Sequence, residues 1–172
     1  SKKVIFLAHC LLNQNAISDG TAVCPAAFGE LIQLLLDHEV GIVQMPCPEL
    51  CCLGLDRGDV HGAERPVVEE NTRIRRAMEK DGPRQKREAL ADLVAEQVQE
   101  YHKHGFQVLG IVGANRSPNC GLETTSDFDR EVESRGAFME AIAQRLEAAG
   151  ISVPMLGLKG SDDAAQKVAA LL

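Results

Sequence analysis

The chain has 172 residues, of which 45% are hydrophobic and 25% charged, and its formal net charge is −7. Such a length and composition are typical of one folded domain, here spanning residues 1–172, and exclude a disordered chain. The negative charge argues against nucleic acid as a partner, and no apolar run is long enough to cross a membrane. The short apolar run near the start does not fit a signal peptide, so we expect a cytoplasmic protein.

Strands and helices alternate in the first half of the chain. Residues 3–8 form an apolar run that predicts a buried strand. A polar loop follows, and Pro25 then stands at the first position of a helix that continues to Asp37. Residues 40–45 predict a second strand, which ends at the prolines behind it because proline cannot continue a ladder. Residues 53–65 contain three glycines and no periodicity, which indicates a long loop of the kind that is often functional.

The alternation continues in the second half. Residues 67–80 and 85–104 predict two helices, the second clearly amphipathic, with a break at residues 81–83 between them. Residues 108–112 predict a third strand. Residues 113–130 have no periodicity and are expected to form a second long loop.

The last predicted elements are a helix over residues 138–149, a fourth strand over residues 151–155, and a helix that begins behind Asp163. Strands that alternate with helices are the pattern of a parallel sheet covered on both faces. We therefore predict an α/β fold with a mainly parallel sheet of about four strands. Because the crossovers share one hand, the carboxyl ends of the strands meet at one edge, where such folds bind ligands.

Three cysteines occupy equivalent places in this fold. Cys10 follows the first strand, Cys47 follows the second, and Cys120 lies in the loop behind the third. All three are therefore expected on loops at the ligand-binding edge, whereas structural cysteines are more often buried within elements. Three thiolates that converge on one edge suit iron–sulfur or zinc coordination. Inert cysteines that share the edge by chance are the alternative.

The remaining cysteines and histidines are less informative. Cys24 begins a predicted helix and is interpreted as a packing residue. Cys51 and Cys52 are adjacent in sequence, so both cannot easily face the same ion, although one could add a ligand. His61 lies in the first long loop and could serve as a further metal ligand.

A basic cluster falls on the two central helices. Acidic residues are interleaved with it, so we interpret it as a solvated helix face, with the docking of a phosphate-bearing substrate as the alternative. Its members are Arg73, Arg75, Arg76, Lys80, Arg84, Lys86 and Arg87.

The three strand-end cysteines lie within short motifs. These are Cys10-Leu11-Leu12, Asp19-Gly20, Cys47-Pro48-Glu49 and Ser117-Pro118-Asn119-Cys120-Gly121. In this order they resemble the 2-thiouracil desulfidase (TudS) family, whose pattern is C-L-L-G-x-x-C-R-Y-D-G, then C-P-E, then S-P-S-C-G, and especially its TudS-related desulfidase branch. Ala16 stands where the family pattern has its second cysteine, and Asn119 stands where it has serine.

The resemblance implies a Rossmann-like three-layer α/β domain that holds a [4Fe-4S] cluster on Cys10, Cys47 and Cys120. It also implies a catalytic carboxyl group at Glu49 and a serine near the substrate at Ser117. A cluster held by three thiolates keeps one iron open to a soft ligand such as a thione sulfur, which activates the thione carbon toward water. Glu49 would suit the proton transfer, and Ser117 a hydrogen bond or a proton relay.

Plainer roles compete with these two. Glu49 could be a capping carboxylate, and Ser117 could be an ordinary turn residue before Pro118.

The sequence thus predicts a cluster-dependent desulfidase that converts the C=S group of a small thiolated substrate, such as a thiouracil-like base or nucleoside, to C=O and sulfide. One alternative is an iron–sulfur carrier that binds sulfide at the open iron and passes it to a partner enzyme, in which case Glu49 would be dispensable. A zinc site on the same cysteines, with His61 as a possible fourth ligand, is the third hypothesis.

Overall fold

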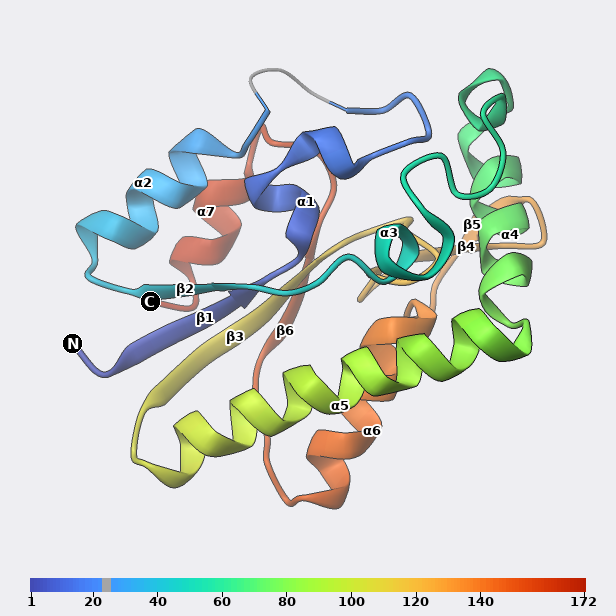
Figure 1. The fold of residues 1–172 in the computed structure, drawn as a ribbon. Coiled ribbons are helices and arrows are strands. Elements are labelled where there is room, and N and C mark those ends of the chain that lie inside the picture. Colours follow the sequence, from blue (N-terminus) through green and yellow to red (C-terminus); the bar gives the residue numbers. More distant parts are fainter. Residues whose placement is uncertain (23–25) are drawn as a thin grey trace.

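The four long strands form one parallel sheet in the order β2-β1-β3-β6 (Figure 1). The computed structural model describes residues 1–22 and 26–172. The strands are β1 (Lys3–Leu7), β2 (Gly41–Gln44), β3 (Gln107–Ala114) and β6 (Met155–Leu158). β1 and β3 are largely buried because helices cover both faces of the sheet. The predicted α/β fold with its Rossmann-like three layers is confirmed.

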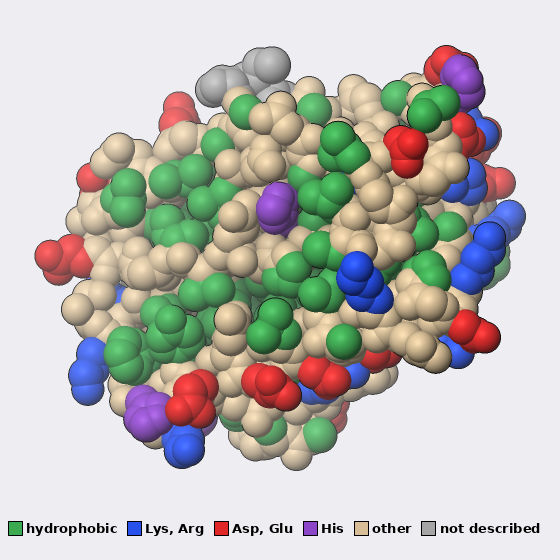
Figure 2. All heavy atoms as spheres, viewed as in Figure 1, with side chains coloured by type: hydrophobic (Ala, Val, Ile, Leu, Met, Phe, Trp, Pro, Cys, Tyr) green, Lys and Arg blue, Asp and Glu red, His purple; other side chains and the backbone are tan. Residues whose placement is uncertain are grey.

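Two pairs of helices cover the sheet (Figure 1). On one face lie α2 (Gly29–Asp37) and α7 (Ala164–Ala169), and on the other lie α5 (Asp81–Lys103) and α6 (Ala137–Ala148). Phe6 and Phe138 are fully buried in the core between these layers, where a change from phenylalanine to alanine typically costs about 3–5 kcal/mol. In Figure 2, acidic side chains follow the outer surface of α5, while hydrophobic side chains lie along the β2 edge.

The helices predicted over residues 67–80 and 85–104 correspond to α4 (Val67–Met78) and α5. The predicted break at residues 81–83 is wrong, because α5 already begins at Asp81. Pro83 lies in the first turn of α5, where its missing N–H leaves no intrahelical hydrogen bond unmade.

Two short helices stand where loops or no elements were predicted. α1 (His9–Leu12) follows β1 directly, and α3 (Pro48–Leu53) follows β2. Pro48 lies in the first turn of α3, a position that favours proline. Helices of one or two turns are too short to show a clear hydrophobic period, so the sequence does not reveal them.

The fourth strand begins later than predicted. It was expected over residues 151–155, but β6 starts only at Met155, where it pairs with Ile111 of β3. Pro154 has no N–H for the ladder, although its carbonyl accepts a hydrogen bond from the Ile111 N–H at 2.8 Å. The apolar residues before it, Ile151 and Val153, pack against the core without forming a strand.

The second predicted loop, residues 113–130, contains part of a small hairpin. β4 (Thr125–Asp127) pairs antiparallel with β5 (Arg130–Val132) and packs against α4. The two residues between these strands, Phe128 and Asp129, both have positive φ angles, as tight hairpin turns require. The hairpin is too short and too polar to be predicted from alternation alone.

The interpretation of the basic cluster as a solvated face is wrong for three of its members. Arg73 ion-pairs with Glu70, and Arg75 donates hydrogen bonds to residues of β4. Arg87 is only 5% exposed and pairs with Glu79 and Glu88. The acidic residues interleaved with the cluster are therefore partners of its arginines.

The order of the strands places a switch point beside β1. β1 pairs with β2 on one side and with β3 on the other, so the chain changes direction across the sheet at their carboxyl ends. Ligands of doubly wound folds bind in the crevice at such a point.

Cys24 and Pro25, for which packing and helix-starting roles were predicted, lie outside the described residues. None of the helices formed by residues 1–22 and 26–172 is long and apolar enough to span a membrane.

Candidate functional site

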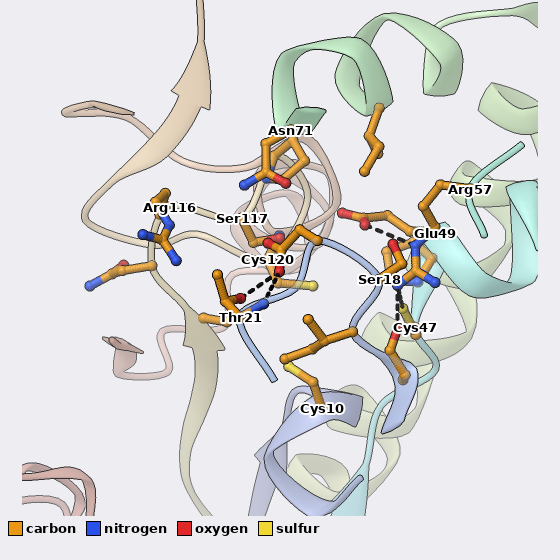
Figure 3. A pocket seen from close by; sticks show the side chains of 18 residues that line it. Cys10, Ser18, Thr21, Cys47, Glu49, Arg57, Asn71, Arg116, Ser117 and Cys120 are labelled. Atoms are coloured by element: carbon orange, nitrogen blue, oxygen red, sulfur yellow. Dashed lines mark hydrogen bonds and ion pairs between the residues drawn. The ribbon is translucent and has the colours of Figure 1, made fainter. Parts of the chain in front are cut away.

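A cavity of about 110 Å³ lies at this edge of the sheet (Figure 3). The five residues singled out in the sequence all line it: Cys10, Cys47, Glu49, Ser117 and Cys120. They come from segments behind three different strands and are separated by up to 110 positions in the chain. Polar side chains complete much of the remaining wall, namely Ser18, Asp19, Thr21, Arg57, Asn71, Asn115 and Arg116.

One of the three cysteines belongs to a helix and not to the loop that was predicted. Cys10 lies in α1, immediately behind β1. Cys47 is the N-cap of α3, and its Sγ accepts a hydrogen bond from the Leu50 N–H at 3.5 Å. Cys47 and Cys120 lie on the predicted loops, behind β2 and behind β3. The prediction that all three meet at the carboxyl edge is nevertheless correct.

The loop that carries Cys120 is held by side chains that accept hydrogen bonds from its backbone. Asn115 Oδ1 accepts from the N–H groups of Leu122, Glu123 and Thr124 at 3.1–3.4 Å. The carbonyl of Cys120 accepts from the Ala114 N–H of β3 at 2.9 Å. The loop is therefore folded back onto the end of the sheet, which places Cys120 over the cavity.

The three thiols share a buried and electrostatically coupled environment. Burial, together with the neighbouring Cys47 and Glu49, raises the pKa of Cys10 to about 12. Burial and Glu49 likewise raise the pKa of Cys47 to about 11, and burial with Cys47 and Cys10 raises that of Cys120 well above its usual range. The pKa values of Cys10 and Cys120 are therefore raised in part by neighbouring thiols. A bound cation would reverse this balance, because it stabilises thiolates.

The donor set of the cavity fits an iron–sulfur cluster in its chemistry. Three thiols line the wall, and no histidine does so among the described residues. In residues 1–22 and 26–172, no three cysteine, histidine or acidic side chains stand close enough together to hold a single metal ion. Zinc would need sulfurs about 3.8 Å apart, as follows from Zn–S bonds of about 2.3 Å in a tetrahedron. In a cluster each cysteine binds a different iron, so its sulfurs stand farther apart.

Glu49 lies on α3 with both carboxylate oxygens engaged. Oε1 accepts a hydrogen bond from Arg57 Nε at 3.2 Å, and Oε2 accepts one from Asn119 Nδ2 at 3.0 Å. The side chain is 12% exposed. Glu49 does not cap a helix with its side chain in these contacts, and its carboxylate is held in one orientation at the cavity wall.

Ser117 stabilises a turn, as the alternative interpretation of the sequence predicts. Its Oγ accepts hydrogen bonds from the N–H groups of Asn119 and Cys120 at 3.3 and 3.0 Å. A hydrogen bond from Ser117 also favours the thiolate of Cys120. Since Ser117 lines the cavity as well, its structural role does not remove it from the site.

Arg57 is a site residue that the sequence analysis missed. It lies in the long loop behind α3, has a positive φ angle, and is only 4% exposed. Its guanidinium contacts Glu49 and Cys47. The sequence predicts a loop of a kind that is often functional, but nothing local in the sequence shows that this arginine turns inward.

Other candidates lie away from the cavity. His61 pairs with Glu64 at 3.0 Å, and its side chain is 70% exposed. Cys51 and Cys52 lie on α3 and are not among the described residues that line the cavity. The structure therefore does not bring His61, Cys51 or Cys52 together with the three predicted ligands.

Comparisons with known proteins give one relative and no activity. No protein-family model matches the chain. A protein of Methanocaldococcus jannaschii described as "Uncharacterized protein MJ0003" is 27% identical over 146 residues, which cover 82% of this chain and 85% of that protein. No solved structure matches. The function must therefore be argued from the site itself.

Proposed function

We propose that Cys10, Cys47 and Cys120 hold a [4Fe-4S] cluster and that the chain removes sulfur, as sulfide, from a thiolated small molecule. The observation that carries this proposal is that three thiols from the ends of three neighbouring strands line one buried cavity together with the carboxylate of Glu49. The motif resemblance to the TudS family supports the same residues. The substrate class is a thiouracil-like base or nucleoside.

When bound, a cluster held by three thiolates supplies one iron with an open position that acts as a Lewis acid toward sulfur. The overall reaction consumes one water: C=S and H₂O become C=O and H₂S. Water adds through its oxygen to the thione carbon, the C–S bond breaks, and the two protons of water end on the departing sulfide.

Glu49 is the group that accepts a proton from the attacking water. Arg57 donates a hydrogen bond to one carboxylate oxygen and Asn119 donates one to the other. The carboxylate is therefore already oriented before substrate binds. Positioned general bases typically contribute about 10²–10⁴-fold to a rate. Its low exposure keeps bulk water from competing for the same oxygens.

Ser117 stabilises sulfur at the same wall. Its oxygen lone pairs are engaged by two backbone N–H groups, so its hydroxyl hydrogen is directed toward other acceptors. Cys120 is one such acceptor, and a heteroatom of the substrate in the cavity is a second.

The cofactor is tested first, with anaerobically purified and reconstituted protein. We expect broad absorption at about 400 nm and roughly four irons per chain. Cys10→Ser should lose both signals, whereas Cys51→Ser, which lies outside the cavity, should keep them. A wild-type protein that stays colourless and binds one zinc ion instead would contradict the proposal.

Turnover is tested with Glu49→Gln. Sulfide release from 2-thiouracil and a panel of other thiobases should fall at least about 100-fold, because the general base is lost, while iron content stays unchanged. Glu64→Gln, on the exposed loop, is the matched control and should keep full activity. Unchanged sulfide release in Glu49→Gln would refute the role of Glu49 as general base. Bound sulfide without turnover in the wild type would instead support the sulfide-carrier alternative.

A further inference from the structure

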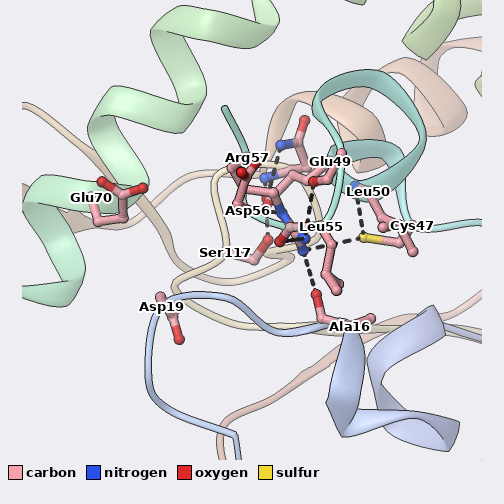
Figure 4. Close-up of polar contacts among 12 residues, drawn as sticks. Ala16, Asp19, Cys47, Glu49, Leu50, Leu55, Asp56, Arg57, Glu70 and Ser117 are labelled. Atoms are coloured by element: carbon pink, nitrogen blue, oxygen red, sulfur yellow. Dashed lines mark hydrogen bonds and ion pairs between the residues drawn. The ribbon is translucent and has the colours of Figure 1, made fainter. Parts of the chain in front are cut away.

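The side chain of Arg57 joins three segments that meet at the cavity (Figure 4). Nη2 donates to the carbonyl of Ala16 at 2.6 Å, and Nη1 donates to the carbonyl of Leu55 at 2.9 Å. The same guanidinium reaches Glu49 through Nε at 3.2 Å and Cys47 Sγ through Nη2 at 3.7 Å. One rigid planar group therefore touches a proposed cluster ligand and the proposed catalytic carboxylate at once.

The backbone of Arg57 is anchored independently of the cavity. Its carbonyl accepts a hydrogen bond from Arg73 Nη2 at 3.1 Å, and its N–H donates to the carbonyl of Gly54 at 3.1 Å. Arg73 is itself paired with the buried Glu70. The backbone that carries the guanidinium is thus held by α4 and by the long loop, through contacts that do not involve Glu49 or Cys47.

We infer that Arg57 is the positioning residue of the site: its fixed guanidinium orients Glu49 and supplies positive charge to the Cys47 sulfur. This role rests on the proposed function and explains how Glu49 and the cysteines act together. With a cluster bound, three thiolates and a carboxylate concentrate negative charge along one cavity wall. A buried cation that bonds to two of these groups offsets part of that charge.

The two parts of this role can be separated by substitution. Arg57→Met removes the charge and the hydrogen bonds, so the reduction potential of the bound cluster should become more negative, because hydrogen bonds and positive charge at a ligand sulfur favour the reduced state. Arg57→Lys keeps the charge but lacks the planar group whose Nε binds Glu49 while its Nη atoms are held by the carbonyls of Leu55 and Ala16. Its potential should stay close to that of the wild type, while kcat for 2-thiouracil falls about tenfold or more with little change in KM.

The experiment is an anaerobic redox titration of the reconstituted wild type and both variants, together with sulfide-release kinetics and iron analysis. Arg87→Met is the matched control, since it removes another buried arginine that pairs with Glu79 and Glu88 outside the cavity. It should shift neither the potential nor kcat. Circular dichroism establishes that each variant is folded.

The outcomes distinguish this inference from the proposed function. A wild type that binds no iron overturns both. Iron binding with equal potentials in the wild type and Arg57→Met, and equal kcat in Arg57→Lys, overturns the role of Arg57 and leaves the cofactor standing. If Arg57→Met does not fold, Arg57→Lys decides alone: a lower kcat at unchanged KM and potential supports the inference, and wild-type kinetics refute it.

Discussion

At the scale of single residues, the site is organised around hydrogen bonds to Glu49, and Asn119 provides one of them. Its Nδ2 donates to Glu49, whereas its Oδ1 is buried with no hydrogen-bond partner among the described residues. An unsatisfied buried acceptor costs about 1–3 kcal/mol. Asn119 therefore adds little to stability through this amide, which points to orientation of Glu49 as its contribution.

Asn119→Ala should separate these two effects. We expect turnover to fall about tenfold, which corresponds to about 1.4 kcal/mol of lost orientation. The thermal midpoint should change little, because the lost hydrogen bond and packing are offset by removal of the unsatisfied oxygen. Sulfide-release assays and thermal melts of the reconstituted protein measure both quantities, and a large drop in the midpoint with unchanged turnover would contradict the assignment.

At the scale of elements, the buried carboxylate of Glu70 on α4 stabilises the long loop that carries Arg57. Glu70 is 1% exposed and ion-pairs with Arg65 and Arg73, and Arg65 also pairs with Asp59 at 2.6 Å. Gly62 lies directly against the Glu70 carboxylate, so a Cβ at this position would collide with it. These contacts tie the long loop behind α3 to the helix that follows it.

The stability that Glu70 contributes should depend on pH. Burial alone would raise its pKa, but the hydrogen bonds and charges of Arg73 and Arg65 outweigh burial and lower the pKa below its ordinary value of 4.5. A depressed folded-state pKa gives stability that is present above the unfolded pKa and is lost as pH falls through the folded value. Glu70→Gln should therefore be less stable at pH 7, by about 1–3 kcal/mol.

Urea denaturation at pH 7 and below pH 4.5 tests this linkage. The difference between Glu70→Gln and the wild type should shrink as the pH falls through that range, since the wild type then loses the same charge. Glu140→Gln, which replaces an exposed member of a surface pair, serves as the control and should change stability little at either pH. A difference that is equal at both pH values would refute the assignment.

At the scale of the whole molecule, the sequence predicts the parallel sheet and the place of the three cysteines, but it does not predict the hydrogen bonds that complete the site. Apolar runs predict β1, β2 and β3. The signal is clearest for β1 and β3, because strands buried on both faces are apolar along most of their length. From these strands follows the meeting of Cys10, Cys47 and Cys120. The inward turn of Arg57 and the bond from Asn119 depend on tertiary packing, which no local pattern encodes.

The three cysteines also connect separate parts of the chain, so a bound cluster should stabilise the fold as a whole. They follow β1, β2 and β3, and a ligand that binds only the folded state raises stability by mass action. We expect the reconstituted protein to melt about 5–10 °C above the apo form, as about 2–3 kcal/mol would give for a chain of this size.

Anaerobic thermal melts of both forms provide the measurement. Cys120→Ser treated with iron and sulfide in the same way is the control and should melt like the apo form. Identical midpoints for apo and iron-loaded wild type would show that the cluster does not bridge the three segments.

The attachment of the Cys120 loop has a consequence for how such a site can diversify. Asn115 Oδ1 accepts hydrogen bonds from three N–H groups of the loop. The Arg116 N–H donates to Thr124 Oγ1, and the Arg116 carbonyl accepts from Ser126 Oγ, so the Arg116 backbone is part of the same framework. The Arg116 side chain lines the cavity, and the framework's hydrogen bonds among the described residues use only the backbone of Arg116. If the proposed function holds, selection could exchange that side chain and alter which molecules the cavity accepts, while the loop keeps the Cys120 thiol in place.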